Sequence, residues 1–233
     1  MKKTPVVSSL LKESTIDYAS HITKLIFTSG CNFRCSYCHN SVLWEKRRNT
    51  LTYPQLTEML DQARENWVDA ICITGGEPTI HPDLAEMIRF IKQQNFMVKL
   101  DTNGSHPDMV EELLEVVDYF AMDYKASLEH YPKITRVNID PALIRRSRDL
   151  IIQRSRDYEF RTTVVPGFHK PGEIRQICRE LQGSKRVVFQ PFVPKEELLD
   201  NDYIRVKRTR KDLLEQVLTI ARKALPESEV ICR

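Results

Sequence analysis

The sequence predicts an α/β protein in which strands alternate with helices and pair into a parallel sheet. Short apolar stretches rich in β-branched residues end in Gly, Asp or Pro, and amphipathic stretches with helical periodicity separate them. The chain has 233 residues, which suits a single domain. We expect its core over about residues 22–195 and a last helix at about 209–224.

Six strands are expected. The first apolar stretch ends in the turn Thr28-Ser29-Gly30, and the second ends in Gly75-Gly76. Turn residues of this kind commonly end a strand. The segments between strands are long enough for the helical crossovers that parallel pairing requires. The expected strands lie at residues 25–27, 70–74, 96–100, 119–125, 158–165 and 186–190.

The expected helices begin at capping residues. Thr52 and Gln55 have the capping-box spacing, Asp83 precedes the second helix, and Asp140 precedes a proline at the first helical position. The helices lie at about 52–67, 83–91, 108–117, 140–151, 171–181 and 209–224. Six such units are too few for a closed barrel of eight. Before residue 21 only a short edge strand is expected, at 15–18.

Composition excludes several classes of protein. With 41% hydrophobic and 29% charged residues, the chain resembles a globular protein. No apolar run is long enough to cross a bilayer, and the N-terminus lacks the apolar stretch of a signal peptide, so we expect a cytoplasmic protein without a membrane partner. A net charge of +3 gives no reason to expect nucleic acid. Three cysteines are scattered, which does not make a disulfide framework.

The other three cysteines, Cys31, Cys35 and Cys38, fall within eight positions on the loop after the first strand. Closely spaced thiolates on a loop suggest a metal, either zinc or an iron–sulfur cluster. A zinc site would need a fourth ligand, for which His39 is the nearest candidate. Adjacent residues rarely reach one ion, so we expect a cluster. Buried apolar cysteines would have no reason to gather on a polar loop.

Polar motifs follow the other strands too. The active sites of parallel α/β barrels collect at the carboxyl ends of the strands, where the βα-loops converge. We therefore expect the cysteine loop to meet the following residues: Gly75, Gly76 and Glu77 after the second strand, Asp101, Thr102 and Asn103 at the end of the third, Asp123 and Lys125 at the end of the fourth, and Arg161 within the fifth.

The spacing Cys-x3-Cys-x2-Cys, with Tyr37 before the third cysteine, resembles the signature of the radical S-adenosylmethionine (SAM) enzymes. The resemblance implies a partial (β/α)6 TIM-like barrel. It also implies that the three cysteines hold a [4Fe–4S] cluster whose fourth iron is open to SAM. Tyr37 would match the position near the adenine, and Gly75, Gly76 and Glu77 would match the element that binds the SAM amino group.

Further motifs are similar to those of the activating enzymes of glycyl radical proteins. These are Cys38-His39-Asn40, residues 100–104 and residues 122–125. Within that group the chain looks most like the activating proteins of anaerobic ribonucleoside-triphosphate reductase. The resemblance implies an enzyme that cleaves SAM reductively, with an electron from a flavodoxin- or ferredoxin-like protein, and generates a glycyl radical on a partner enzyme.

Charge assigns expected roles around SAM. Lys125 and Arg161 suit the carboxylate or the ribose side of SAM. Asp101 and Asp123, with Thr102, are candidates for a monovalent cation site beside the SAM carboxylate, as the resemblance to activators suggests. The alternative is that the aspartates cap the helices that follow them.

Two expectations concern the surroundings of the site. The sixth strand is followed by Pro191-Phe192-Val193, where the pyruvate formate-lyase activator has a histidine, and His169 in the preceding loop is expected to be solvated without a role. An open mouth lined by Trp44, Tyr131 and Phe192 is expected to admit the partner's glycine loop.

Two other functions remain open. One is a radical SAM enzyme that acts on a peptide or small molecule, such as a 7-carboxy-7-deazaguanine-synthase-like enzyme, which would turn over a diffusible substrate alone. The other is an iron–sulfur electron carrier or a zinc-stabilised module, which would not form 5′-deoxyadenosine from SAM.

Overall fold

A computed structural model of the protein describes residues 3–45, 50–194 and 205–233. The described strands form one sheet in the order β3-β1-β2-β4-β5-β6-β7-β8-β9. Their bounds are β1 Lys3–Ser14, β2 Thr23–Thr28, β3 Thr50–Thr52, β4 Ala70–Gly75, β5 Met97–Thr102, β6 Tyr119–Asp123, β7 Tyr158–Val164, β8 Arg186–Pro191 and β9 Glu229–Cys232. Along the part of this order that runs from β2 through β4 to β9, neighbouring strands pair in parallel. The strand β1 pairs antiparallel with both β2 and β3.

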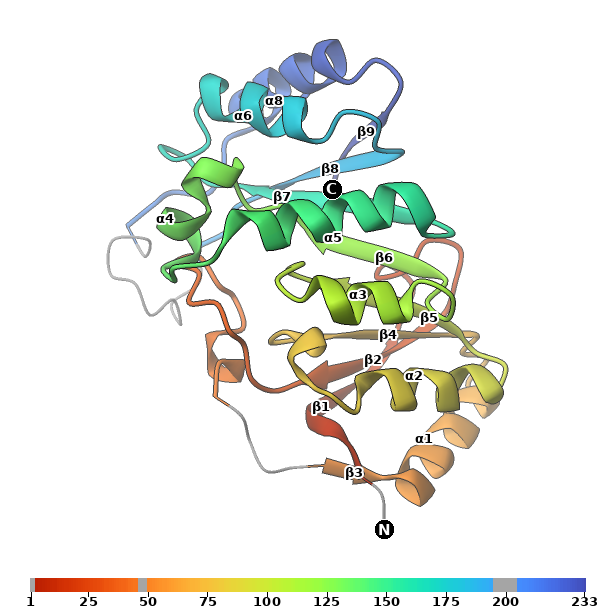
Figure 1. Ribbon diagram of the computed structural model, residues 1–233. Coiled ribbons are helices and arrows are strands. Elements are labelled where there is room, and N and C mark those ends of the chain that lie inside the picture. Colours follow the sequence, from red (N-terminus) through yellow and green to blue (C-terminus); the bar gives the residue numbers. More distant parts are fainter. Residues whose placement is uncertain (1–2, 46–49, 195–204) are drawn as a thin grey trace.

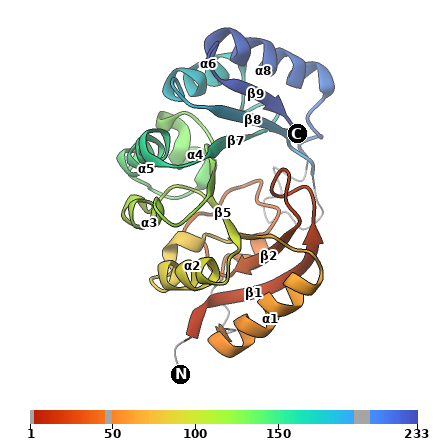
Figure 2. The same ribbon diagram turned by 90° about the vertical axis from the view of Figure 1, so that its right-hand side faces the viewer.

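The helices lie along one side of the curved sheet (Figures 1 and 2). Their bounds are α1 Tyr53–Glu65, α2 Leu84–Gln93, α3 Pro107–Leu113, α4 Tyr131–Thr135, α5 Pro141–Arg154, α6 Pro171–Glu180 and α8 Lys211–Ala224, with short 3-10 helices at Ser41–Leu43, Pro78–Ile80 and Leu128–His130. Among the described helices, none has the length and hydropathy of a membrane-spanning segment. The six predicted strand–helix units are confirmed, and the sheet stays open as a partial barrel.

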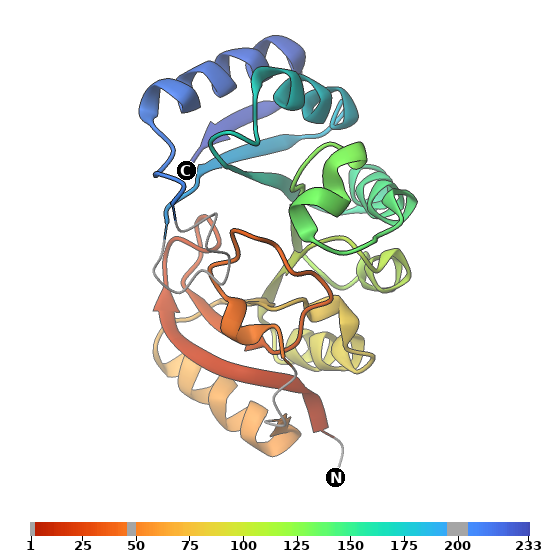
Figure 3. The same cartoon turned by 90° about the vertical axis from the view of Figure 1, so that its left-hand side faces the viewer.

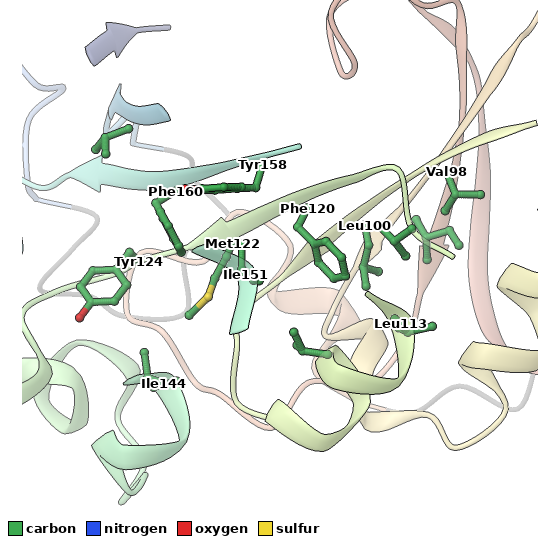
Figure 4. Close-up of a cluster of buried hydrophobic side chains, with 14 of the residues drawn as sticks. Val98, Leu100, Leu113, Phe120, Met122, Tyr124, Ile144, Ile151, Tyr158 and Phe160 are labelled. Carbon is green, nitrogen blue, oxygen red and sulfur yellow. The ribbon is translucent and has the colours of Figure 1, made fainter. Parts of the chain in front are cut away.

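The two faces of the sheet differ because side chains alternate along each strand. One face packs against the helices through fully buried apolar side chains, with Ile144 and Ile151 of α5 opposite the central strands (Figure 4). The strand residues on this face include Val98, Leu100, Phe120, Met122 and Phe160. The intervening positions, such as Lys99, Asp101 and Arg161, are polar and belong to the concave face.

Two of the three predicted capping residues make capping hydrogen bonds. The Thr52 hydroxyl accepts a hydrogen bond from the Gln55 backbone N–H, and the Gln55 side chain accepts from the Thr52 backbone N–H, which completes a capping box. Asp140 accepts from the Ala142 backbone N–H at the start of α5. Asp83 stands at the N-cap of α2, although its side chain makes no capping bond. Local sequence signals therefore place these helix starts correctly.

Three strands were not predicted. The pairing of β1 with β2 shifts register twice, so β1 has no strict two-residue alternation. β3 has three residues and β9 has four, which is too short for a periodic signal. The predicted edge strand at 15–18 is wrong, because this segment is a bend in which Tyr18 packs against Tyr119 on the concave face.

Candidate active site

A cavity of about 470 Å³ lies at the carboxyl ends of the parallel strands. Seen toward these ends, the loop that carries the three cysteines lies inside the arc of the sheet (Figure 3). All thirteen predicted site residues line this cavity: Cys31, Cys35, Tyr37, Cys38, Gly75, Gly76, Glu77, Asp101, Thr102, Asn103, Asp123, Lys125 and Arg161. The structure thus brings together residues from the loop after β2 and from β4, β5, β6 and β7.

The cysteine loop is fixed by backbone hydrogen bonds to its surroundings. The Cys31 N–H donates to the Trp44 carbonyl at 3.2 Å, and the Arg34 N–H donates to the Thr135 carbonyl at 2.9 Å. A third bond, from the Cys38 N–H to the Cys35 carbonyl at 3.1 Å, closes a turn between two of the cysteines. The three thiols are therefore held at one end of the cavity before any cofactor binds.

The thiols have the chemistry of iron–sulfur ligands. Burial raises the pKa of Cys31 to about 11 and that of Cys35 to about 12, while the nearby Lys125 ammonium acts in the opposite direction. A thiolate at this depth needs strong positive charge beside it, which a metal cluster provides. Three unpaired thiols on one cavity wall fit a [4Fe–4S] cluster, with Cys31, Cys35 and Cys38 as its protein ligands.

The zinc alternative finds no support in the geometry. The His39 Nε2 donates to the Val193 carbonyl at 2.7 Å, which leaves Nδ1 as the one ring nitrogen with a lone pair. In the part of the chain that the structure describes, no three His, Cys, Asp or Glu side chains converge on one ion. A cluster with several irons does not require its ligands to converge on a single point.

The loop after β4 lies directly against the cysteine loop. The Gly76 N–H donates to the Thr28 carbonyl at 2.9 Å, and the Glu77 N–H donates to the Gly30 carbonyl at 2.8 Å. A Cβ atom on Gly76 would overlap the Gly30 carbonyl, and Gly75 adopts a φ of +120° that other residues rarely adopt. The two glycines are thus required by the approach of the two loops.

The Glu77 carboxylate is buried and serves the protein itself. Its Oε1 accepts from the Thr79 N–H at 3.1 Å, the Thr79 hydroxyl at 2.5 Å and the Thr102 hydroxyl at 2.7 Å. Its Oε2 accepts from the Asn103 N–H at 2.6 Å. Burial raises the pKa of Glu77, and the four bonds oppose this effect. Glu77 therefore joins the loops after β4 and β5, in addition to facing the cavity.

A residue that the sequence did not single out, Asn32, ties the cysteine loop to the loop after β5. Its Oδ1 accepts from the Asn103 side-chain amide at 3.0 Å, and its own amide donates to the Ser105 hydroxyl at 2.8 Å. Asn103 in turn accepts from the Ser105 N–H at 2.9 Å. Asn103 is thus placed as predicted, and its contacts give it a role in loop positioning.

Five charged residues form a continuous network across β5, β6 and β7. Lys99 lies 3.1 Å from Asp101, and Arg161 lies 3.2 Å from the other oxygen of Asp101. The Arg161 Nε donates to Asp123 at 2.9 Å, and Lys125 lies 3.0 Å from the second oxygen of Asp123. The network itself holds three cations and two carboxylates, but Lys99 does not line the cavity, and Asp17 and Glu77 add two carboxylates to its lining.

The network shifts the ionisation of its members. Burial opposes the charged form of Asp123, but Arg161 and Lys125 together lower its pKa to about 2. Burial likewise opposes the charged form of Lys125, but Asp123 and other neighbours raise its pKa well above the ordinary value. Both groups are therefore charged at neutral pH, as binding of a carboxylate ligand by Lys125 requires.

The same contacts bear on the predicted cation. Both oxygens of Asp101 and both oxygens of Asp123 already face Lys99, Arg161 or Lys125. Among the described residues, however, the buried Asp101 Oδ1 accepts no hydrogen bond, so this oxygen keeps a lone pair for a cation. The cation stays a prediction, and the alternative role of the aspartates as helix caps is replaced by pairing across strands.

Two expected mouth residues lie elsewhere. Tyr131 and Phe192 are fully buried in the core, whereas Trp44 is partly buried and lines the cavity. A proline follows Tyr131 and another precedes Phe192, which suggested that both aromatics lie on surface loops. A neighbouring proline does not determine whether an aromatic side chain is buried. Other cavity residues to which the sequence analysis gave no role in SAM binding are Asp17, Phe33, His39, Asn40, Thr74, Thr163 and Gln190. The inward-facing positions of β7 and β8 would have indicated Thr163 and Gln190.

His169 is the third correction. It was expected to be solvated, but it is 1% exposed and contacts the loop that carries Lys125. A larger cavity of about 830 Å³ lies on the outer side of this loop, between Ser127, His130 and Glu173. It contains none of the predicted site residues, so the chemistry belongs to the smaller cavity.

Comparison with known proteins agrees with this assignment. A sequence model described as the Radical SAM superfamily matches residues 25–181. A Methanocaldococcus jannaschii protein, provisionally named a glycyl-radical enzyme activating enzyme, is 32% identical over 225 residues, which are 94% of this chain and 92% of that protein. The 7-carboxy-7-deazaguanine synthase of Methanothermobacter thermautotrophicus is 32% identical over 124 residues, which are 53% of this chain and 49% of that enzyme.

Among solved structures, Streptococcus suis SuiB bound to S-adenosylmethionine has a TM-score of 0.68 at 14% identity. The match covers 88% of this chain and 48% of SuiB, so this chain spans about half the length of that protein. At this identity the likeness shows a shared fold.

Proposed function

This chain belongs to the radical SAM superfamily, and we propose that it is an activating enzyme that generates a glycyl radical on a partner protein. The expected partner is anaerobic ribonucleoside-triphosphate reductase, and the expected reductant is a flavodoxin- or ferredoxin-like protein of the cytoplasm. The observation that carries the proposal is the likeness to the provisionally named activating enzyme of M. jannaschii over 94% of this chain and 92% of that protein.

The residues of the cavity would have different roles in this reaction. When bound, a [4Fe–4S] cluster supplies the electron that splits SAM into methionine and a 5′-deoxyadenosyl radical, which takes a hydrogen atom from the glycine α-carbon. Cys31, Cys35 and Cys38 hold the cluster. Lys125 and Arg161 bind the SAM carboxylate or ribose side. Gly75 and Gly76 allow backbone to approach the ligand, and Tyr37 faces the adenine side.

The cavity is also pre-organised for its ligand. Its walls are held by Glu77, Asn32 and the charged network, so the ligand-binding groups need no rearrangement when SAM enters. A monovalent cation at Asp101 and Asp123 remains part of the proposal, and it predicts that the affinity for SAM depends on potassium or sodium.

The deciding experiment follows the transfer of deuterium from the partner's glycine to 5′-deoxyadenosine. Mixing the reconstituted protein with anaerobic reductase, SAM and a low-potential reductant without oxygen should give a glycine-centred doublet in electron paramagnetic resonance. Deuterium placed on the α-carbon of that glycine should appear in 5′-deoxyadenosine, one per radical. A Cys35→Ala protein is the control and should give neither signal. Label that stays in the partner would contradict the activating function.

A small-molecule reaction is the second candidate, because 124 residues are 32% identical to a 7-carboxy-7-deazaguanine synthase. Such an enzyme would consume a diffusible substrate in many turnovers without a partner protein. An activating enzyme should show only slow cleavage of SAM under those conditions. An electron carrier, the third possibility, would form no 5′-deoxyadenosine at all.

A further inference from the structure

The segment Tyr124–Leu128, which follows β6 and carries Lys125, is fixed by hydrogen bonds from most of its backbone N–H groups to neighbouring elements. The Tyr124 N–H donates to the Arg161 carbonyl at 2.8 Å, and the Tyr124 carbonyl accepts from the Thr162 hydroxyl at 2.7 Å. Farther along, the Ser127 N–H donates to Glu173 at 2.6 Å, and the Leu128 N–H donates to Glu180 at 3.0 Å. A loop with this many bonds to its neighbours is pre-organised.

The peptide groups of Lys125 itself are held from two sides. Its N–H donates to the Tyr131 hydroxyl at 3.1 Å, and its carbonyl lies 3.0 Å from the His169 Nε2. Tyr131 and His169 are both buried, and only Lys125 among these three lines the catalytic cavity. The Lys125 side chain takes no part in these two contacts and reaches Asp123 at 3.0 Å.

The hydrogen bonds assign the tautomer of His169. Its Nδ1 accepts from the Val165 N–H at 2.9 Å, so Nδ1 carries no proton. Nε2 must then carry the proton and donate it to the Lys125 carbonyl. Burial lowers the pKa of His169 to about 4, which keeps the ring neutral at physiological pH. The ring therefore bridges the ends of β6 and β7 in a single orientation.

We infer that His169 and Tyr131 are positioning residues that fix the main chain of Lys125 and so aim its ammonium at the SAM site. This inference rests on the SAM site proposed above and not on the identity of the partner. It predicts that loss of the His169 donor weakens SAM binding while the cluster remains, because the two ring nitrogens of His169 bond to Val165 and Lys125 and not to the cysteine loop. Supporting groups of this kind typically change affinity by about 10–100-fold when removed.

Two substitutions separate the functions of the ring. His169→Asn can keep an acceptor at the Nδ1 position and loses the donor to Lys125, whereas His169→Gln can place an amide donor near the Nε2 position. Tyr131→Phe removes the bond to the Lys125 N–H. Its matched control is Tyr158→Phe, which removes a bond from the Lys185 N–H to the Tyr158 hydroxyl at the opposite end of the sheet.

The experiment titrates SAM into each reduced, cluster-loaded protein and follows the paramagnetic spectrum of the cluster, after iron content has been measured. His169→Asn and Tyr131→Phe should bind SAM about tenfold more weakly, or worse, at unchanged iron content. His169→Gln and Tyr158→Phe should remain within about twofold to threefold of the parent protein, below the typical supporting-group effect. In the cluster-free protein, a nitrogen-15 spectrum should show one neutral His169 tautomer with its proton on Nε2.

Each contrary outcome has a distinct meaning. Wild-type SAM affinity in His169→Asn, or equal weakening in His169→Gln and His169→Asn, would overturn the positioning role of the Nε2 donor. If His169→Asn does not fold, the comparison of Tyr131→Phe with Tyr158→Phe decides, and equal affinities in that pair overturn the inference. Unchanged affinity in Lys125→Ala would instead reject the proposed SAM site.

Discussion

Cys35 and Cys178 show how position decides the role of a buried cysteine. Both thiols are buried, and burial raises the pKa of each. Cys178 lies on α6 within the apolar core, whereas Cys35 lines the cavity beside two further thiols. Only the second environment offers a place for a metal cluster.

Replacing Cys35 by Ala should therefore remove the cluster, because three thiolates hold it and the chain offers no substitute at this place. Anaerobic reconstitution of the parent protein should give about four iron per chain. Iron and sulfide analysis should give values near zero for Cys35→Ala. Cys178→Ala is the control, and retention of a full cluster in Cys35→Ala would contradict the assignment.

Glu77→Gln should destabilise the protein, because the Gln amide group would face N–H and O–H donors where the carboxylate accepts four hydrogen bonds. Loss of such buried bonds costs about 1–3 kcal/mol. Urea unfolding of the cluster-free protein measures this change in the free energy of unfolding. Glu58→Gln at an exposed position of α1 should change it by less than about 0.5 kcal/mol. Equal effects of the two substitutions would contradict the role of Glu77.

At the scale of elements, the site depends on how closely two loops approach. At Gly76 and Glu77 the loop after β4 contacts the cysteine loop through backbone atoms, so there is no room for a side chain on Gly76. Helix caps place α1 and α5, but the contact between these loops results from the parallel pairing of β2 with β4. In this pair Thr28 lies opposite Gly75, which brings both strand ends to the same level.

Gly76→Ala should therefore separate the two loops and weaken both cluster retention and SAM binding. The added Cβ would overlap backbone atoms, which cannot yield as a flexible side chain can. Gly172→Ala is the matched control, since a Cβ there meets nothing within 4 Å. Iron content after gel filtration and SAM titration compare the two. Equal cluster retention and SAM affinity in both proteins would argue against the close approach.

At the scale of the whole molecule, the sheet separates two environments. Its outer face and the helices form the apolar core, and its concave face carries the charged network. Ionisable groups that are buried on or near the concave face make the stability of the fold depend on pH. If the folded state resists protonation of such a group, protonation of the unfolded chain favours unfolding.

His169 predicts one part of this pH dependence. Its pKa falls from 6.5 to about 4 on folding, so its stabilising contribution is complete above pH 6.5 and is lost as pH falls toward 4. The loss should be about 3 kcal/mol in total. Unfolding free energies of the parent protein and His169→Gln, measured in urea between pH 7 and pH 4, should differ by an amount that shrinks over this interval. A constant difference would refute the prediction.

The sequence alone determined the features that depend on neighbouring residues. Strand and helix periodicity gave the six parallel units, caps gave the helix starts, and the spacing of Cys31, Cys35 and Cys38 gave the cluster loop. The rule that parallel strands end at one edge was enough to gather all thirteen site residues around one cavity. These inferences need only local conformation and a general property of the fold.

The tertiary structure decided which partners the side chains meet. Glu77 binds Thr102 and Asn103, Arg161 binds both aspartates, and His169 is buried against Lys125. These partners come from different strands, 25 to 60 residues apart in the chain, so no local pattern encodes their contact. Burial and hydrogen bonding depend on packing over the whole sheet, which a sequence pattern specifies only through the complete fold.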